Sequence, residues 1–572
     1  MARKKLKFVL GWHMHQPHYR EGENGSYHLP WVYLHALKDY TDMAAHFENE
    51  PAMRAVVNFA PTLLEQLDDY AQQIDALINK QQPCADELIN LVAGSSAIPD
   101  DIGARRKIIS DCQRCHAPQL IEPYPAFAAL ISKLGEDASK PTDELIAQLD
   151  KQYFVDLLVW YHIAWLGESL KSHPTAKALM TKQTDFNSSD QTALITLMYE
   201  AINGIIPRYK KLADSGQVEL SMTPYAHPIV PLLNDFENMQ CAQPEAPRPS
   251  ESHYPDGNAR NHWHMREGLD TYRHYFDATP TGVWLSEGGI SDDALDVLTE
   301  YNIKWTASGQ GVWGNTCHRS DMDKEIIYNK KALFSPFKLN DLDINVFFRD
   351  DGLSDFIGFE YSHWDAQQAA NDFVKHLENI HGFLGENVDE HVISVVLDGE
   401  NAWEYYPHNG SHFLSKLYEK LANHPLIEAT TFADVCSDET IKPISVNQLC
   451  AGSWVYGSFS TWIGQDDKNR AWDYLVAAKR AFDEVVATNT LSKDILKQTE
   501  RQLAICEGSD WFWWFGDYNS SDSVRDFDLL FRTQLKRLYT LLGKASPDYL
   551  NQPISVGGGD AENSGTMQRG VN

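Results

Sequence analysis

The 572-residue chain is predicted to fold as a parallel α/β protein whose strands form a closed or nearly closed barrel. Short β-rich runs recur at long intervals, and they are apolar almost throughout, which is typical of strands covered on both faces. Helical patterns lie between several of these runs, as in alternating β and α units. Seven runs are about the number that a barrel requires. They span residues 7–12, 55–60, 217–222, 281–285, 303–308, 344–349 and 392–398.

A long helical insertion is expected between the second and third strands. Residues from about 62 to 210 contain several helix-like stretches and no convincing strand. Three of the stretches, at 63–77, 144–158 and 192–212, carry clear helical patterns. We therefore expect this segment to stand outside the barrel.

Helices are also predicted directly after three of the later strands. After the fourth strand, Ser291 is a suitable N-cap, and acidic residues follow it in the first turn. After the last two strands, apolar residues recur at helical spacing. These residues are Ala369, Phe373, Leu377 and Ile380 in one helix and Phe413, Leu417 and Leu421 in the other.

The remaining segments divide the chain into three parts. Residues 1–430 are expected to form the barrel domain with its insertion, including a long functional loop at 224–262 that is rich in Pro, Asn and His. Residues 431–548 are expected to form a mainly helical domain, with apolar stripes at 469–486 and 493–506. Residues 549–572 are rich in Gly, Ser and Asn and are predicted to be disordered.

Composition narrows the class of protein. The chain has 49 Lys plus Arg against 80 Asp plus Glu, a formal charge of −31, which disfavours nucleic acid or an anionic membrane as partner. It has no run of about 18 apolar residues that could span a membrane. The apolar stretch near the start is too short for a signal peptide, so a cytoplasmic location is expected. Eight thinly spread cysteines suit reduced thiols, and the oligomeric state is left open.

Two carboxylates follow predicted strands and are the candidates for acid–base chemistry. Glu287 ends the fourth strand and precedes two glycines, and Asp398 ends the last and most apolar strand. The carboxyl ends of barrel strands form the catalytic face, so these groups would converge there. A nucleophile and an acid/base about 5 Å apart are the minimum set for retaining glycoside hydrolysis. The alternative is that each carboxylate caps the helix that follows it.

Three histidines are candidate binding residues. His13 and His15 alternate on the first strand and therefore point to the same side, and His227 lies after the third strand. They could donate hydrogen bonds to sugar hydroxyls. With Asp398 they could instead ligate a metal in a metal-dependent deacetylase or hydrolase.

Two further patterns have competing interpretations. Cys112-Gln-Arg-Cys115-His116 formally matches a haem-attachment motif, although a thiol pair on a helix or loop is the simpler interpretation. The 16 tryptophans include Trp403, Trp462 and a cluster at 511–514. Most are expected in the core, but some would serve as platforms for sugar rings, either in an enzyme or in a non-catalytic glucan-binding module.

Five separated motifs resemble those of glycoside hydrolase family 57, in the family's order. The first is His13-Met-His-Gln-Pro17, the second runs from Gly216-Gln-Val-Glu219 to His227-Pro228, and the third is Trp284-Leu-Ser-Glu-Gly288. The fourth is Leu397-Asp-Gly-Glu-Asn-Ala-Trp-Glu404 and the fifth Gly508-Ser-Asp-Trp511. Gly452-Ser-Trp454 and Thr461-Trp-Ile-Gly464 are similar to the α-amylase and amylopullulanase branch.

The resemblance implies an incomplete (β/α)7 barrel, followed by a helical region that closes the cleft, and α-1,4-glucan substrates. It implies a retaining mechanism with Glu287 as nucleophile and Asp398 as acid/base, and neither a metal nor another cofactor. Asp510 would be a subsite residue. Hydrolysis and transfer by a 4-α-glucanotransferase or branching enzyme stay open alternatives, because they differ in acceptor binding. The candidate substrate-binding residues are His13, His15, His227, Arg349, Trp403, Trp462 and Asp510.

Overall fold

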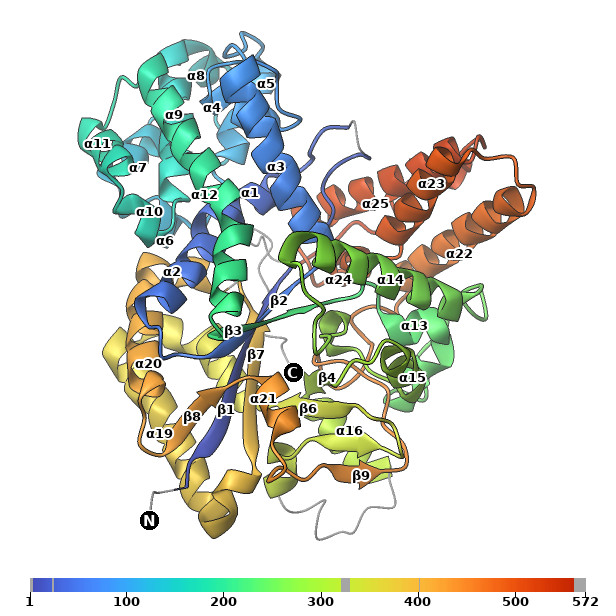
Figure 1. The fold of residues 1–572 in the computed structure, drawn as a ribbon. Helices are drawn as coiled ribbons and strands as arrows, with labels where there is room; N and C mark the ends of the chain where they lie inside the picture. The colour runs from blue at the N-terminus through green and yellow to red at the C-terminus, as the bar shows by residue number, and fades with distance from the viewer. Residues whose placement is uncertain (1–3, 23–24, 320–329, 401, 560–572) are drawn as a thin grey trace.

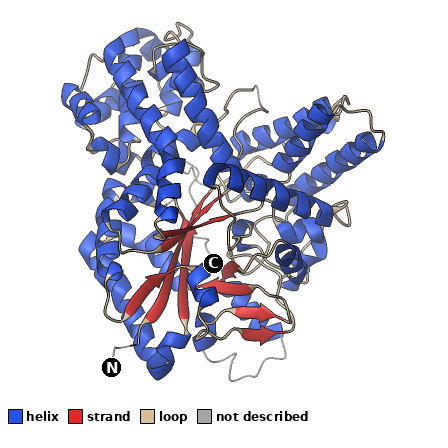
Figure 2. Ribbon diagram, viewed as in Figure 1, coloured by secondary structure: helices blue, strands red, loops and turns tan. Residues whose placement is uncertain are grey.

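A computed structural model of the chain describes residues 4–22, 25–319, 330–400 and 402–559. Six of the seven expected strands are present, and they pair in parallel in the order β3-β2-β1-β7-β6-β4. Figure 2 shows these strands as one group surrounded by helices. They are β1 (Leu6–Met14), β2 (Ala55–Phe59), β3 (Val218–Met222), β4 (Trp305–Gly309), β6 (Asn345–Arg349) and β7 (Val392–Asp398).

The seventh run, at residues 281–285, is not a regular strand, but it closes the ring. Val283 makes a parallel bridge to Met222 at the end of β3, and Gly282 makes one to Trp305 at the start of β4. A Cβ atom on Gly282 would lie 1.9 Å from the Trp305 ring, so only glycine allows this approach. The predicted α/β barrel is therefore confirmed, with a thin closure at this segment.

Three short strands extend the sheet beyond the ring. β5 (Phe337–Leu339) pairs antiparallel with β6, and β8 (Ile427–Thr430) pairs with β1. β9 (Ile444–Val446) pairs with β5. The sheet thus continues past residue 430, where the sequence analysis placed a domain boundary. The strand β9 was missed because a strand of three residues leaves little signal in the sequence.

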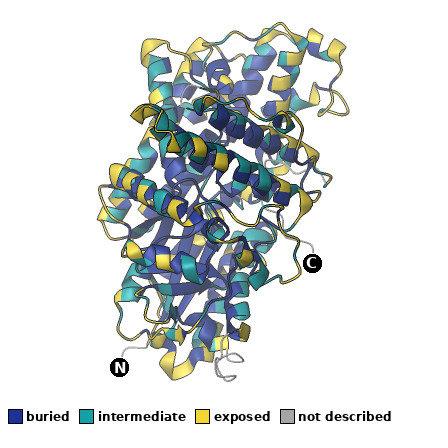
Figure 3. Ribbon diagram, turned by 90° about the vertical axis from the view of Figure 1, so that its right-hand side faces the viewer, coloured by how far each residue is buried: buried dark blue, intermediate teal, exposed yellow. Residues whose placement is uncertain are grey.

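Successive side chains of each strand point to opposite faces and belong to two separate hydrophobic clusters. Val9, Val56, Trp305 and Val396 point into the barrel, where they pack as one buried cluster. The outward residues of the same strands pack beneath the surrounding helices in a much larger cluster. Figure 3 shows the strands as buried and the exposed residues on the outer faces of the helices. Buried side chains therefore pack on both faces of the strands that lead to the carboxyl ends.

The helical insertion is confirmed between β2 and β3. The expected helix at 144–158 is interrupted, because Asp150 caps a new helix by accepting a hydrogen bond from Tyr153 N. The insertion contains α3 (Pro61–Lys80), α4 (Glu87–Val92), α5 (Ile102–Asp111), α6 (Ala117–Leu120), α7 (Pro125–Ser132), α8 (Asp143–Gln148), α9 (Lys151–Ala164), α10 (Glu168–Lys171), α11 (Pro174–Lys182) and α12 (Ser188–Asp214).

Further helices surround the barrel. Ser291 caps α15 as expected, through Ala294 N. The segment at 224–262, expected to be a loop, contains α13 and the start of α14, which its Pro, Asn and His content obscured. These helices are α1 (Trp31–His35), α2 (Thr41–Asn49), α13 (Val230–Asn234), α14 (Gly257–Phe276), α15 (Asp292–Glu300), α16 (Gln310–Arg319), α18 (Asp351–Asp355), α19 (Ala366–Leu384), α20 (Ser411–Ala422) and α21 (Phe432–Ser437).

The C-terminal region is mainly helical, as expected. It contains α22 (Asp466–Ala487), α23 (Lys493–Cys506), α24 (Asp510–Trp514) and α25 (Ser521–Leu541). The prediction of disorder from residue 549 is wrong for 549–559. Leu550 and Ile554 are buried there, and Ile554 N donates to Asp528 on α25. The rest of the predicted disordered tail, 560–572, lies outside the described residues.

The arrangement places the strand ends between two helical masses. In Figure 1, β1 runs upward from near the N-terminus. The carboxyl ends of the strands lie below the insertion on the left and below α22, α23 and α25 on the right. Among the described helices, none combines the length and apolar character that crossing a membrane requires.

Candidate active site

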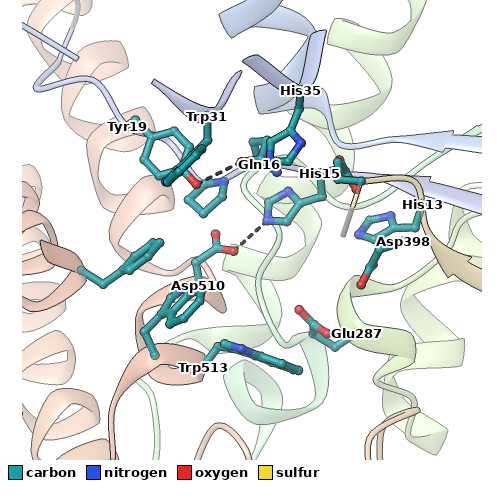
Figure 4. A pocket seen from close by; sticks show the side chains of 14 residues that line it. His13, His15, Gln16, Tyr19, Trp31, His35, Glu287, Asp398, Asp510 and Trp513 are labelled. Atoms are coloured by element: carbon teal, nitrogen blue, oxygen red, sulfur yellow. Dashed lines mark hydrogen bonds and ion pairs between the residues drawn. The ribbon is translucent and has the colours of Figure 1, made fainter. Parts of the chain in front are cut away.

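A polar cleft lies at the carboxyl ends of the barrel strands. The space within it, including the part open to solvent, is about 710 Å³. Side chains from both ends of the chain line it, since α24 of the C-terminal region meets the segment that follows β1 (Figure 4). The lining comprises His13, His15, Gln16, Pro17, Tyr19, Trp31, His35, Glu287, Asp398, Glu400, Asp510, Trp513, Trp514 and Phe527.

Glu287 occupies a strained turn at the edge of this cleft. Its backbone has φ 59° and ψ 23°, the left-handed region that a residue with a side chain adopts at a cost of about 1–3 kcal/mol. Gly288 also has positive φ, and Ser308 Oγ donates to its carbonyl oxygen at 2.6 Å. Surrounding contacts therefore impose a conformation that the local sequence disfavours, and such strain is concentrated at functional sites.

The segment before the C-terminal helices holds Glu287 in place. Trp454 N donates to the Glu287 carbonyl at 3.1 Å, and Trp454 Nε1 donates to Glu287 Oε2 at 3.0 Å. Gly309, at the end of β4, allows this approach, because a Cβ there would lie 2.6 Å from Trp454 Cα. One tryptophan thus orients the carboxylate and stabilises its ionised form.

Asp398 ends β7 directly beside the first strand. Its Cα is paired in register with that of His13 on β1. The guanidinium of Arg349 lies nearby: it donates to Val396 O at 3.1 Å and stacks on the Trp454 ring at 4.7 Å. Burial raises the pKa of Asp398 to about 6, while the nearby Arg349 and His15 act to lower it.

Glu287 and Asp398 face one another in the cleft. Figure 4 shows their carboxylates turned toward the same space. Burial raises the pKa of Glu287 well above its ordinary value, and the charge of Asp398 raises it further. Two interacting carboxylates of this kind titrate as a pair, because the charge of one raises the pKa of the other.

A chain of hydrogen bonds connects the histidines behind these carboxylates. His13 Nδ1 lies 2.7 Å from Asn58 Oδ1, His13 Nε2 lies 3.1 Å from His227 Nε2, and His227 Nδ1 lies 2.8 Å from Ser509 Oγ. Burial lowers the pKa of His13 to about 3 and that of His227 well below its ordinary value, so both rings are neutral. With neutral rings, one set of donors is consistent: the Ser509 hydroxyl donates to His227 Nδ1, His227 Nε2 donates to His13 Nε2, and His13 Nδ1 donates to the Asn58 side-chain oxygen.

His227 adopts the left-handed region as well, with φ 59°. Its ring stacks on that of His15, with centroids 3.7 Å apart, and its Nδ1 lies 4.0 Å from Glu287 Oε1. His15 Nε2 in turn lies 2.8 Å from Asp510 Oδ1. The three expected histidines and Asp510 therefore form one network beside the catalytic candidates.

Glu400 is a further carboxylate in the cleft that the sequence interpretation did not include. It accepts hydrogen bonds from Tyr40 OH at 2.5 Å and from His15 N at 2.8 Å. Burial raises its pKa well above the ordinary value, and the charge of Asp398 adds to this. Its place as the second acid of Asp-Gly-Glu-Asn at 398–401, two residues after Asp398, was the signal in the sequence for this residue.

The metal alternative is only partly matched. Among the described residues, one group has a geometry that could hold a metal ion: His15, His227 and Asp510, with ligand atoms within 4.8 Å of one another. This differs from the set of His13, His15, His227 and Asp398 that the sequence suggested. Both ring nitrogens of His227 already have hydrogen-bond partners, which a metal would have to displace. The residues thus fit a polar network better than a metal centre.

The structure does not bring every candidate to the cleft. Trp403 is 2% exposed and packs on Trp12, and Trp462 is fully buried beside Trp513. Neither indole offers a platform for a sugar, because almost none of either side chain is exposed. Trp513 lines the cleft instead. Arg349 lies behind Asp398 rather than in the lining.

The Cys112 and Cys115 motif lies away from the cleft. Both thiols are buried, at 0% and 1% exposure, and burial raises both pKa values well above the ordinary value. The next residue, His116, donates its backbone N–H to Glu404 at 2.5 Å. Two buried free thiols match the simple thiol-pair interpretation.

The fold has counterparts among solved structures. A branching enzyme of glycoside hydrolase family 57 from Thermococcus kodakaraensis aligns with a TM-score of 0.58 at 15% identity, over 94% of this chain and 90% of that chain. The α-amylase AmyC from Thermotoga maritima aligns with a TM-score of 0.56 at 13% identity, over 96% of both chains. A 4-α-glucanotransferase from Thermococcus litoralis aligns with a TM-score of 0.51 at 13% identity, over 94% of this chain and 60% of that chain.

The sequence also matches a family model directly. The model of glycosyl hydrolase family 57 matches residues 9–447, which is well over half of the chain and runs from within β1 to the end of β9. The match spans the strand ends that carry Glu287 and Asp398. The chain therefore belongs to glycosyl hydrolase family 57.

Proposed function

We propose that the protein is a retaining glycoside hydrolase that cleaves α-1,4-linked glucans by double displacement. The observation that carries this proposal is the pair of buried carboxylates, Glu287 and Asp398, facing one cleft from two barrel elements. One carboxylate attacks and the other transfers the proton, which is the minimum that retention requires.

In the first step, Glu287 attacks the anomeric carbon while Asp398 donates its proton to the departing glycosidic oxygen. A covalent glycosyl ester of Glu287 forms, and the first product leaves. In the second step, Asp398 takes a proton from water, which attacks the anomeric carbon and breaks the ester. Two inversions return the original configuration.

Burial raises the pKa of both acids in the unliganded cleft, to about 6 for Asp398 and well above the ordinary value for Glu287. We propose that bound substrate leaves the proton on Asp398. Positive charge develops at the anomeric carbon in the transition state, and it favours an ionised Glu287 directly beneath it.

The roles are tested with Glu287→Gln and Asp398→Asn, on maltooligosaccharides and on a 4-nitrophenyl α-maltooligoside. Each variant should lose at least about a thousandfold in kcat on maltooligosaccharides. Because 4-nitrophenolate leaves without a proton, Asp398→Asn should still release it in a burst. Added azide should then give an α-glycosyl azide with Asp398→Asn and a β-glycosyl azide with Glu287→Gln.

Glu300→Gln is the matched control, because Glu300 is an exposed acid on α15. It should keep the parent activity. If either cleft variant kept most of its maltooligosaccharide activity, or if the two azide products had the same configuration, the assigned roles would be wrong.

The choice of acceptor is tested by a product time course on one defined maltooligosaccharide. Hydrolysis gives only products shorter than the substrate. Products longer than the substrate would show that a sugar replaces water, as in a glucanotransferase or branching enzyme. A protein that bound the glucan without changing it would instead be a binding module.

A further inference from the structure

A second polar pocket lies beside the cleft, and we propose that it binds the phosphate group of a small molecule. The segment 16–20 separates the two hollows. Pro17 and Tyr19 line the catalytic cleft, whereas His18 and Arg20 line the second pocket. The space within this pocket, including the part open to solvent, is about 1060 Å³, and α3, α23 and α25 form its other walls.

Three guanidinium groups converge on this pocket, and two of them are neutralised. Arg20 donates two hydrogen bonds to Asp69, at 2.9 and 2.8 Å. Arg501 pairs with Glu65 and bonds Tyr225 OH. These two cations are therefore committed to acidic or phenolic partners within the wall.

Arg537 on α25 is the third cation, and it differs from the other two. Its Nε is buried and has no hydrogen-bond partner, and no ion pair of this side chain occurs among the described residues. Gly22, with φ 63°, packs against it, since a Cβ there would lie 3.2 Å from Arg537 Nε. A buried guanidinium N–H without an acceptor is costly, so the pocket is complementary to an anion with several oxygens.

Three arginines and two acids, Glu65 and Asp69, line the pocket, although the whole chain carries a formal charge of −31. Burial, followed by the charges of Arg20 and Arg501, lowers the pKa of His18 to about 4. His18 Nδ1 also lacks a hydrogen-bond partner. A neutral imidazole and an unpaired guanidinium together offer bonds to a phosphate and to a neighbouring hydroxyl.

The catalytic cleft is an unsuitable site for the same ligand. It is lined by the acids Glu287, Asp398, Glu400 and Asp510, which repel a phosphate dianion. Phosphate binding and glucan cleavage therefore belong to different hollows. The phosphate group could belong to inorganic phosphate or to a sugar phosphate, and the affinities of the pocket for these two ligands distinguish them.

The test is calorimetric titration of the full chain with inorganic phosphate, glucose 6-phosphate and maltose. Both phosphate probes should bind, and their affinity should fall as salt is raised. The one that binds more tightly identifies the source. Bound phosphate should not be displaced by maltose. Arg537→Gln should weaken phosphate binding at least about tenfold, because a charge-assisted contact is lost.

Arg525→Gln is the matched control, because Arg525 is an exposed arginine on the same helix. It should leave phosphate affinity unchanged. Arg537→Lys, which keeps the charge but loses the planar fork, provides a second variant should Arg537→Gln unfold. The proposal is overturned if neither phosphate probe binds at millimolar concentration, if the Arg537 variants bind like the parent, or if maltose displaces phosphate. None of these readouts depends on glucan cleavage.

Discussion

Two residues of the site adopt backbone conformations that side chains disfavour. Glu287 and His227 both have φ 59°, and both lie directly after segments that are packed in the barrel. The cost of each is offset by bonds from remote segments: Trp454 N to Glu287 O, and Ser509 N to His227 O. The two strained residues lie side by side, with His227 Nδ1 4.0 Å from Glu287 Oε1, and such strain is concentrated at functional sites.

The Trp454 indole should set the ionisation of Glu287. Trp454→Phe keeps an aromatic ring against Trp284 and Arg349 but removes the donor to Glu287 Oε2. The pKa of Glu287 should rise, because its ionised form loses a hydrogen bond. The acidic limb of the kcat/KM profile should move to higher pH, and kcat/KM at pH 6 should fall roughly 10–100-fold.

Trp165→Phe provides the control for this substitution. Trp165 is a buried tryptophan of the insertion whose Nε1 has no hydrogen-bond partner. Its replacement should leave the profile where it is. An unmoved acidic limb in Trp454→Phe would mean that Glu287 does not ionise in the step that limits kcat/KM.

At the scale of elements, one buried carboxylate joins α23 to α14. Glu507 follows α23 and accepts hydrogen bonds from Tyr254 OH at 2.6 Å, Arg260 Nη2 at 2.8 Å and His264 Nε2 at 2.8 Å. Arg260 is the main cause that lowers the pKa of Glu507, to about 2, against its burial. Because Ser509 and Asp510 follow immediately, this junction positions the side chains that contact His227 and His15.

Glu507→Gln should destabilise the fold by about 3 kcal/mol at pH 7, since it leaves Arg260 buried without its partner. The folded pKa lies below the unfolded value of 4.5, so this stabilisation is fully present above pH 4.5. It is lost as the pH falls from 4.5 toward 2. Denaturant unfolding across this range should show the parent and the variant converging.

Glu484→Gln, at an exposed position on α22, is the control and should change stability by less than about 0.5 kcal/mol. A constant difference between Glu507→Gln and the parent down to pH 2.5 would contradict the assigned ionisation.

At the scale of the whole molecule, the cleft is assembled from distant parts of the chain. His15 lies near the start, Glu287 and Asp398 lie in the middle, and Asp510 lies near the end. We therefore propose that the C-terminal helices complete the catalytic unit, rather than forming an appended module.

Asp510→Asn tests that proposal. The pair of Asp510 with His15 should weaken, because the neutral amide no longer attracts the imidazole. We expect kcat/KM on maltooligosaccharides to fall about tenfold or more, with an unfolding midpoint close to that of the parent. Asp522→Asn, an exposed position on α25, should change neither quantity. If Asp510→Asn kept the kinetics of the parent, the proposal that the C-terminal region contributes to catalysis through Asp510 would be wrong.

Much of this organisation was accessible from the sequence. Apolar runs located six strands, and the residues that follow them, such as Glu287 and Asp398, could be placed on one face of a barrel. The run at 281–285 was also placed correctly in the ring, although it pairs through single bridges. The short strands β5, β8 and β9 escaped notice, because three or four residues carry no periodicity.

The sequence by itself determined the order of the six main strands, the helical insertion between two of them and the acids at the strand ends, because periodicity records which side of its own element a residue faces. The tertiary structure alone decided the bonds from Trp454 and Ser509, the inclusion of Glu400 and the burial of Trp403 and Trp462. It also decided the raised pKa values of the paired acids. Burial and electric field depend on which remote segments pack around a group, and no local pattern contains that information.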